Sequence, residues 1–185
     1  MTSKRLLDLC GAIVGLLVSL PVLVFIAIAI KLDSRGPVFF TQVRVGRQGR
    51  PFQLYKFRSM GVDADKHSAI TGSVDARVTR VGRMLRPWRL DELPQLLNVL
   101  RGEMSLVGPR PIVEAEIAKY GRRFAAYCAV KPGITGLWQV NGRSDLPWDE
   151  AVRLDVSYVE NWSFVLDLQI MWKTWSAVWH GDGAY

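Results

Sequence analysis

The sequence has 185 residues and a formal net charge of +7, with 24 Lys or Arg against 17 Asp or Glu. This length fits one domain with a moderate core, so residues 1–185 are treated as a single unit. The positive surplus favours an anionic partner, which leaves nucleic acid, anionic lipid and phosphorylated substrates open. Its two cysteines, Cys10 and Cys128, lack the spacing of a zinc site, and a structural disulfide is not expected. The seven tryptophans are many for a soluble domain and suit a protein at a membrane interface.

An uncharged apolar run fills most of the first thirty residues. It extends from Leu9 to Ile30, and a helix of that length would be about 33 Å long, enough to cross the hydrocarbon core. The run is too long for the core of a signal peptide, and no small-residue cleavage site follows it. A membrane helix over residues 1–33 is therefore expected, and its presence argues against a nucleic-acid-binding domain.

Two features bear on how this segment enters the bilayer. Pro21, with Ser19 two residues before it, lies in the middle of the run and should kink the helix. Basic residues flank both ends, with Lys4 and Arg5 before the run and Lys31 followed by four arginines after it. The positive-inside rule would place both flanks in the cytoplasm. These features favour a re-entrant membrane helix hairpin, in which Ser19 helps to cover the freed carbonyl, over a straight spanning helix.

Two short strands are predicted after the membrane segment. Val38–Val45 and Phe52–Phe57 are rich in β-branched and aromatic residues, and turn residues precede and separate them. The strands form a β-hairpin with Lys56 and Arg58 at its exit, in the sequence YKFRSM. These two cations either lie on a solvated or lipid-facing edge or contact a substrate. An arginine-rich segment follows from Asp75 to Arg89 and suits a phosphate pocket or an anionic membrane surface.

An acidic pair lies in the most basic part of the chain. Asp91 and Glu92 open the apolar stretch of RLDELPQLLNVLRGEMSLVGPRP. Leu93–Leu100 is predicted to be a helix that tolerates Pro94 in its first turn and ends at Gly102. The pair is either only a cap of this helix or an anionic nucleophile and metal ligand beside cations. Neighbouring helical side chains point about 100° apart, so the two carboxylates are not expected to do the same job.

The next two segments differ in character. Ile112–Val130 alternates charged and apolar residues at helical spacing and is predicted to be one amphipathic helix. The sequence KPGITGLWQVNGRSD then reads as a turn-rich loop, whose backbone amides could bind an anion. Within it, Arg143 would add charge-assisted bonds to a phosphate, and Trp138 or Gln139 could meet a base or a sugar. A plain connecting loop is the alternative.

The last predicted helix lies near the C-terminal end of the sequence. Trp148–Trp162 carries Asp155, and Val165–Trp179 is a helix with tryptophans at 172, 175 and 179. Three tryptophans on a terminal helix indicate anchoring at an interface or packing, rather than a cofactor site. The expected fold is α+β, with a re-entrant membrane helix hairpin, a small β-hairpin and interfacial amphipathic helices.

Three motifs in one order resemble a known family. KFRSM, LRPWRLDELPQLLNVLRGEMSLVGPRP and KPGITGLWQVNGR are together similar to the bacterial sugar transferase family, the monotopic phosphoglycosyl transferases that act on polyprenol phosphate. The resemblance covers nearly the whole chain and implies a re-entrant membrane helix, a few strands and interfacial helices around one catalytic domain. One position departs from the family pattern: members often have Ser-Pro at the helix break, whereas here Leu20 precedes Pro21 and the nearest serine is Ser19.

The resemblance also implies a mechanism. The family's acidic dyad falls on Asp91 and Glu92, so Asp91 would attack the β-phosphorus of a UDP-sugar and release UMP. Polyprenol phosphate would then take the phosphosugar from the carboxylate, which starts assembly of a surface glycan such as an exopolysaccharide, capsule or O-antigen. The dyad would hold Mg²⁺, with Glu92 aimed differently on the same turn. The phosphate contacts are assigned to Arg86, Arg110, Lys56 and Arg143, and Asp155 is a further candidate site residue.

The chain's surroundings follow from the same resemblance. The active site would face the cytoplasm at the bacterial inner membrane, in contact with membrane lipids, and a homodimer is possible. The C-terminal NWSFVLDL and DGAY favour a hexose over an acetamido sugar. The alternative is a non-catalytic, basic lipid-binding module at the membrane interface. It explains the charge, the tryptophans and the apolar run, but not the acidic pair in a basic neighbourhood.

Overall fold

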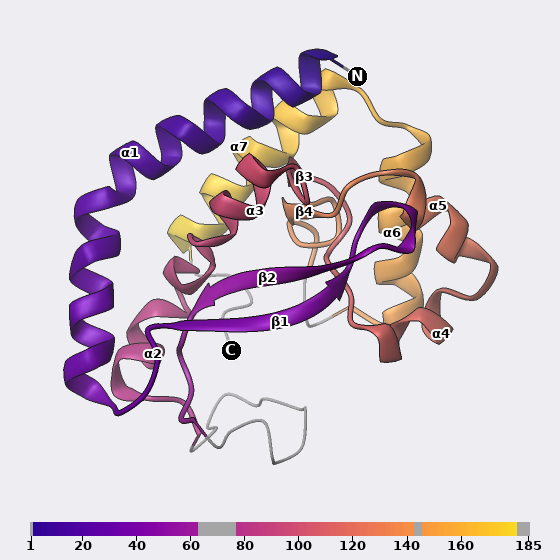
Figure 1. The fold of residues 1–185 in the computed structure, drawn as a ribbon. Coiled ribbons are helices and arrows are strands. Elements are labelled where there is room, and N and C mark those ends of the chain that lie inside the picture. Colours follow the sequence, from indigo (N-terminus) through magenta and orange to yellow (C-terminus); the bar gives the residue numbers. More distant parts are fainter. Residues whose placement is uncertain (1, 63–76, 143–145, 181–185) are drawn as a thin grey trace.

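The fold is known from a computed structural model that describes residues 2–62, 77–142 and 146–180. A long helix, α1, arches along one side, the β1–β2 hairpin crosses the middle, and α3 and α7 run near the first half of α1 (Figure 1). The shorter helices α4 and α5 lie with α6 at the end opposite α2. The regular elements are α1 Thr2–Asp33, β1 Phe39–Val45, β2 Pro51–Phe57, α2 Arg80–Leu85, α3 Gln95–Arg101, β3 Ser105–Val107, α4 Ile117–Tyr120, α5 Phe124–Ala129, β4 Gly133–Thr135, α6 Trp148–Glu160 and α7 Phe164–His180.

The predicted apolar helix is confirmed as α1. Within the described residues it is the one helix long and apolar enough to cross a membrane, and only 11% of its apolar window is buried. It bends partway along its length but stays one helix, so two separate arms of a hairpin are not seen (Figure 1). Pro21 lies inside it, and the Ser19 hydroxyl donates to the carbonyl of Gly15 at 2.6 Å. Such a bond to the preceding turn favours bending, although it reaches a different carbonyl from the one that Pro21 leaves free.

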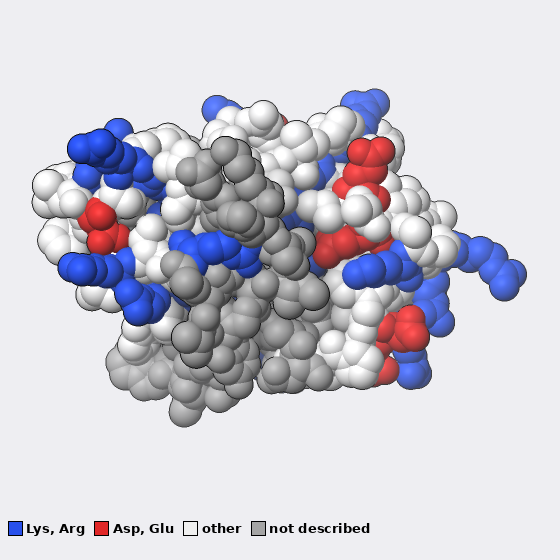
Figure 2. All heavy atoms as spheres, turned by 90° about the horizontal axis from the view of Figure 1, so that it is seen from below, with Lys and Arg blue, Asp and Glu red and all other residues white. Residues whose placement is uncertain are grey.

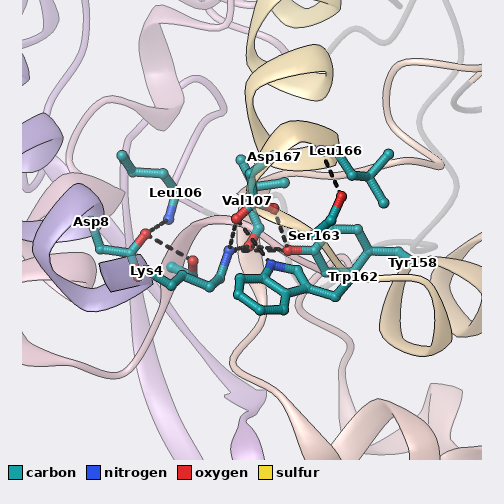
Figure 3. Close-up of polar contacts among 10 residues, drawn as sticks. Lys4, Asp8, Leu106, Val107, Tyr158, Trp162, Ser163, Leu166 and Asp167 are labelled. Carbon is teal, nitrogen blue, oxygen red and sulfur yellow. Dashed lines mark hydrogen bonds and ion pairs between the residues drawn. The ribbon is translucent and has the colours of Figure 1, made fainter. Parts of the chain in front are cut away.

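The first turns of α1 are fixed by a cluster of charged and aromatic side chains (Figure 3). Lys4 Nζ forms an ion pair with Asp167 at 2.5 Å and also donates to Tyr158 Oη and to the carbonyl of Val107. The Trp162 indole donates to the same aspartate at 3.1 Å. Because Asp167 is fully buried, these donors supply the charge and hydrogen bonds that its carboxylate needs. The cluster therefore joins the start of α1 to α7 and β3.

Two further side chains tighten the same attachment. Asp8 accepts hydrogen bonds from the Ser105 hydroxyl and the Leu106 amide of β3, both at 2.9 Å (Figure 3). Arg5 donates to the carbonyl oxygens of Val99 and Leu100 in the last turn of α3, the first of which also accepts from the amide of Gly102. The sequence analysis treated Lys4 and Arg5 only as charges that flank a membrane segment. The structure uses both inside the protein.

The other end of α1 is attached to the same body. Asp33 accepts from the Val81 amide of α2 at 3.1 Å, and Arg58 donates to the carbonyl and the hydroxyl of Ser34. Arg58 is 5% exposed, so these bonds are shielded from water. Both ends of α1 are thus bound to elements of the part formed by residues 39–180.

The β-hairpin has the predicted strands. β1 and β2 pair antiparallel, with Phe40 opposite Lys56 and Arg44 opposite Phe52. Residues directly opposite one another point to the same face of a sheet. Gln42 lies two residues from Phe40 and from Arg44, so alternate residues of β1 share the face of Lys56.

The helix after the acidic pair is also confirmed, with a changed start. α3 ends at Gly102, whose φ of 81° suits glycine. Asp91 does not cap it, because Asp91 lies in a preceding 3₁₀ turn, Leu90–Glu92, and the N-cap position of α3 is Pro94. Asn98 is fully buried in α3 and bonds to two backbone groups of β2, the amide of residue 55 and the carbonyl of residue 53. This amide side chain fixes α3 against the hairpin.

Two predictions for the middle of the chain need correction. Ile112–Val130 is not one amphipathic helix, because Gly121 has a φ of 51° and separates α4 from α5. The expected loop that begins at Lys131 contains a strand, β4, which pairs in parallel with β3. At Gly133 a Cβ atom would lie 2.1 Å from the amide nitrogen of Gly108, so only glycine permits this close pairing.

The last helix presents an apolar stripe. Asp167 and Ile170 of α7 face the interior, whereas Val165, Trp172 and Trp175 are 61%, 75% and 67% exposed. Exposed indoles on an amphipathic helix are typical of a membrane interface. The side chain of Trp179 lies outside the described residues.

Helix α6 carries a carboxyl group that is buried in the core. Asp155 is 1% exposed and accepts a hydrogen bond from the Tyr120 hydroxyl at 2.7 Å. Burial raises the pKa of Asp155 to about 7, although Tyr120 and Arg110 offset part of that effect. Between the ordinary carboxyl pKa and this value, the folded protein holds a proton that the unfolded chain has lost. Stability therefore falls as the pH rises through this window.

Asp155→Asn should therefore raise the melting temperature, and more at about pH 8 than at about pH 5, because the amide cannot ionise. Thermal unfolding of the detergent-solubilised chain at both pH values measures this. Asp149→Asn, an exposed aspartate on the first turn of the same helix, is the control and should change little at either pH. An equal change for Asp155→Asn at both pH values, or a greater loss of stability at the higher pH, contradicts the expectation.

Candidate active site

A cavity of about 620 Å³ opens beside the hairpin. Among the described residues that line it, Asp91 is the one carboxylate. Apolar residues such as Phe39 and Met60 line the rest of the wall. The cavity therefore combines one buried anion with a strongly cationic wall, an arrangement suited to phosphate. The basic residues in this wall are Arg44, Lys56, Arg58, Arg77, Arg86 and Arg110.

The backbone before Asp91 has an unusual conformation. Arg89 has a φ of 52°, in the left-handed region that non-glycine residues rarely adopt. This turn lies between α2 and the 3₁₀ turn that carries Asp91 and Glu92. It directs the chain so that Asp91, which is 9% exposed, lines the cavity.

The two carboxylates of the dyad face different spaces, as their spacing predicts. Glu92 lines a smaller pocket of about 40 Å³, together with Gln139 and Arg110. Lys56 lines both spaces, and its Nζ lies 2.7 Å from Glu92 Oε1. Glu92 is thus occupied by an ion pair, whereas Asp91 faces the large cavity.

The charges around the dyad shift its two pKa values in opposite directions. Burial raises the pKa of Asp91, and Lys56 and Arg86 only partly offset this. Burial also pushes the pKa of Glu92 upward, but Lys56, Arg89 and Arg110 together outweigh it and hold that pKa below its usual range. Glu92 is therefore the more firmly ionised member of the pair.

The cations at the α2 side of the cavity have different roles. Arg86 Nε donates to the Ser59 hydroxyl at 3.2 Å and lines the cavity. Arg58 also lines it, but its guanidinium is used to hold the end of α1. Seen from below, Lys and Arg side chains gather over α2 and the end of α1, whereas acidic and basic side chains alternate over the α4 end (Figure 2). Exposed Lys31 and Arg35 lie at or just beyond the end of α1, and exposed Arg80 and Arg83 lie on α2.

Arg110 lies at the other side of the cavity. Its guanidinium is 5.1 Å from the ring centre of Trp138 and 3.3 Å from the carboxylate of Glu116. One face of the Trp138 indole therefore holds an arginine. Gln139 lines the smaller pocket rather than the large cavity, and its amide donates to the carbonyl of Ile134.

Two further predicted site residues are not among those that line the cavity. Asp155 lies in the core and does not line the cavity. Arg143 lies outside the described residues. Among the residues that the sequence analysis placed in the site, Asp91, Lys56, Arg86 and Arg110 come together in one cavity.

Two cavity residues were missed by the sequence analysis. Arg44 was counted among the basic residues that follow the membrane segment, and Gln42 was not considered. The alternation of β1 was the available signal, because it places both on the face of Lys56 once the hairpin register is known.

The carboxylates of the site fit a magnesium ion that is held mainly by the phosphates of the substrate. In the described residues no three His, Cys, Asp or Glu side chains gather as a metal cluster. Mg²⁺ is usually held by one or two carboxylates together with substrate phosphates and waters. Asp91 offers one such carboxylate in the cavity, whereas Glu92 is already bound to Lys56.

Known proteins resemble the chain over its whole length. The family model described as bacterial sugar transferase matches residues 1–181. The chain is 45% identical over 197 residues to galactosyl transferase CpsE of Streptococcus agalactiae, covering all of this chain and 44% of that protein. It is 41% identical to the undecaprenyl-phosphate galactose phosphotransferase of Salmonella typhimurium, covering 98% of this chain and 41% of that protein. It is 46% identical to the undecaprenyl-phosphate glucose phosphotransferase of Komagataeibacter xylinus, covering 94% of this chain and 35% of that protein.

The chain thus spans less than half the length of these three relatives. The match to the family model nevertheless extends from the apolar helix through α7 and includes every element that lines the cavity. The chain therefore belongs to the bacterial sugar transferase family, as its motifs predict.

Proposed function

We propose that the chain transfers a sugar-1-phosphate from a UDP-sugar to undecaprenyl phosphate, or a similar polyprenol phosphate, and so starts assembly of a surface glycan. The observation that carries this proposal is the buried carboxylate of Asp91 in a cavity whose other charged lining residues, among those described, are all cations. A pure lipid-binding site would gain nothing from an anion at this place. The relatives' names, which include undecaprenyl-phosphate galactose and glucose phosphotransferases, support a hexose.

The chemistry has two steps. An Asp91 oxygen bonds to the β-phosphorus of the UDP-sugar while the bond between that phosphorus and the bridging oxygen breaks, and UMP leaves with the electron pair. An oxygen of polyprenol phosphate then bonds to the same phosphorus, and the Asp91 carboxylate is released. A carboxylate can form such an intermediate when it is positioned beside cations. Lys56, Arg86 and Arg110 stabilise the negative charge that develops on the phosphate oxygens.

Mg²⁺ is the cofactor that we propose. Asp91 and the oxygens of the diphosphate would hold it, and it would neutralise part of the substrate's charge. Glu92 has a different role, because its ion pair keeps Lys56 beside Asp91. The dyad thus divides into one reacting carboxylate and one that orients a cation.

We also propose that α1 is re-entrant and that the cavity faces the cytoplasm at the bacterial inner membrane. Both ends of α1 are bound to the part formed by residues 39–180, which supports entry and exit on one side of the bilayer. The apolar surface of α1 is mostly exposed, as a lipid-facing helix requires. The exposed tryptophans of α7 would lie at the same interface.

Asp91→Asn should abolish covalent labelling of the protein by a UDP-hexose that carries radiolabel in the sugar, with Mg²⁺ and no lipid acceptor. UMP release should fall by at least about a thousandfold, because the nucleophile is lost. Asp149→Asn is the control and should be labelled as the parent is. An adduct on Asp91→Asn would place the nucleophile elsewhere. If the parent gives neither UMP nor lipid product with any common UDP-hexose, a lipid-binding module is the better interpretation.

The raised pKa of Asp91 predicts an unusual pH dependence. The reactive form is the carboxylate, so kcat/KM should fall as the pH drops through this pKa, at a higher pH than for an ordinary carboxyl group. Lys56→Met should move this acid limb to still higher pH, because Lys56 is the strongest influence that lowers the pKa of Asp91. Lys119→Met, on the exposed side of α4, should leave the limb in place. An unmoved limb in Lys56→Met would show that another group controls it.

The topology of α1 can be tested by cysteine labelling. In a background with Cys10→Ser and Cys128→Ser, Ser3→Cys and Arg35→Cys place one thiol at either exposed end of the helix. A membrane-impermeant maleimide should label both variants in inside-out vesicles and neither in right-side-out vesicles. Labelling from opposite sides would establish a spanning helix instead.

A further inference from the structure

Two arginines of the cavity share a single carboxylate. Glu116 lies 3.3 Å from the guanidinium of Arg110 and 4.0 Å from that of Arg44. It is itself fixed, because its other contact is a hydrogen bond from the Val113 amide at 3.0 Å. The three side chains come from β1, from the loop after β3 and from the 3₁₀ turn Glu114–Glu116. Elements far apart in the sequence therefore build this group.

Each arginine has a second support that holds it in place. Arg44 donates to the carbonyl of Pro111 at 2.9 Å and to the side chain of Gln42. Arg110 is held against the ring of Trp138. Guanidinium groups fixed in this way lose little freedom when they bind a phosphate, which they can do with two parallel hydrogen bonds.

The charges of the group do not balance. Arg44 is only 12% exposed in its side chain, and burial, followed by repulsion from Arg110, lowers its pKa. One carboxylate, Glu116, faces two guanidinium groups, so the group retains positive charge. Glu92 lines the smaller pocket with both arginines, but its carboxylate is bound to Lys56. An anion in the cavity would complete the neutralisation.

The position of the group points to one part of the substrate. Arg44 lies near the end of β1 that adjoins the β1–β2 turn and the α4 side, away from α2 and the end of α1 (Figure 1). Arg58 and Arg86 line the cavity from the α2 side. The lipid acceptor belongs near the exposed apolar surface of α1, whereas a nucleotide is soluble in water. The arginine pair on the far side therefore suits the nucleotide.

We propose that Arg44 and Arg110, held in register by Glu116, bind the phosphate of the nucleoside monophosphate part of the donor. This inference rests on the proposed function and adds two residues to it: Arg44 as a binding residue and Glu116 as a positioning residue. The pair holds the donor before reaction and holds the released nucleoside monophosphate afterwards. It contacts no part of the lipid acceptor.

Equilibrium binding of UMP to the full chain in detergent, measured by calorimetry without lipid acceptor, tests the arginine. Arg44→Gln should bind UMP about tenfold more weakly than the parent, the size of one lost charge-assisted hydrogen bond. Arg50→Gln, which removes the same charge from an exposed position next to the same hairpin turn, should bind as the parent does. Arg44→Lys keeps the charge without the two-pronged guanidinium and should also bind more weakly, which guards against loss of folding in the glutamine variant.

Glu116→Gln tests the positioning role of Glu116. An effect of net charge and an effect of arginine positioning predict opposite changes in the affinity for UMP. The substitution makes the cavity more positive, so a purely electrostatic effect would tighten UMP binding. Positioning requires weaker binding by severalfold, since the two guanidinium groups then repel without a shared partner. Glu114→Gln changes the same charge on the same 3₁₀ turn at an exposed position and should not weaken binding. Tighter binding by Glu116→Gln would overturn its positioning role.

The outcomes separate this inference from the proposed function. If the parent binds UMP and Arg44→Gln binds it equally well, the arginine pair is not the nucleotide site, although the proposed transfer stands. If Arg44→Gln loses affinity for a short-chain polyprenyl phosphate as much as for UMP, the assignment to the nucleotide is wrong. A parent chain that neither binds UMP nor releases it from any UDP-hexose overturns both proposals.

Discussion

The Lys56–Glu92 ion pair is the contact on which the site depends, because it joins the β-hairpin to the turn that carries Asp91. The pair is only partly exposed, so its attraction is stronger than that of a surface pair. Removing either partner would leave the other charge in a poorly solvated place. Asn98 supports the same junction by bonding α3 to the backbone of β2. The ion pair holds the 3₁₀ turn against the hairpin, and Asn98 holds α3 there. Asp91 lies in that turn and lines the cavity.

Much of the fold could be predicted because its signals are local. Strand composition and turn residues place the ends of β1 and β2 within one residue of those observed, and Gly102 ends α3 as expected. Pro21 marks a helix that bends. Among the cavity residues, Asp91, Lys56, Arg86 and Arg110 were predicted from the sequence, because family motifs surround each of them. Three motifs in one order made the family assignment possible, whereas the acidic pair alone left capping and chemistry equally open.

The remaining features depend on contacts between distant segments, which periodicity cannot report. Arg44 was assigned to a basic flank because its partner Glu116 lies far along the chain. Lys4 was assigned to the membrane for the same reason, since Asp167 lies beyond every other element of the core. Gly121 stands within a helical pattern, and only its backbone conformation shows that the pattern is interrupted there. The sequence thus predicts the helices and strands well, but it predicts which distant side chains come together only where a family motif indicates it.

The cluster around Lys4 has a consequence for the order of assembly. Lys4 and Asp167 are separated by 163 positions, so the ion pair cannot form until residue 167 has been synthesised. With the membrane attachment proposed above, α1 would reach the bilayer while Lys4 and Arg5 still lack these partners, so that their charge would be available to orient the helix. The same two side chains are later bound by α3 and α7. In this proposal the same two cations would first orient the nascent helix and would afterwards bind it to α7 and α3.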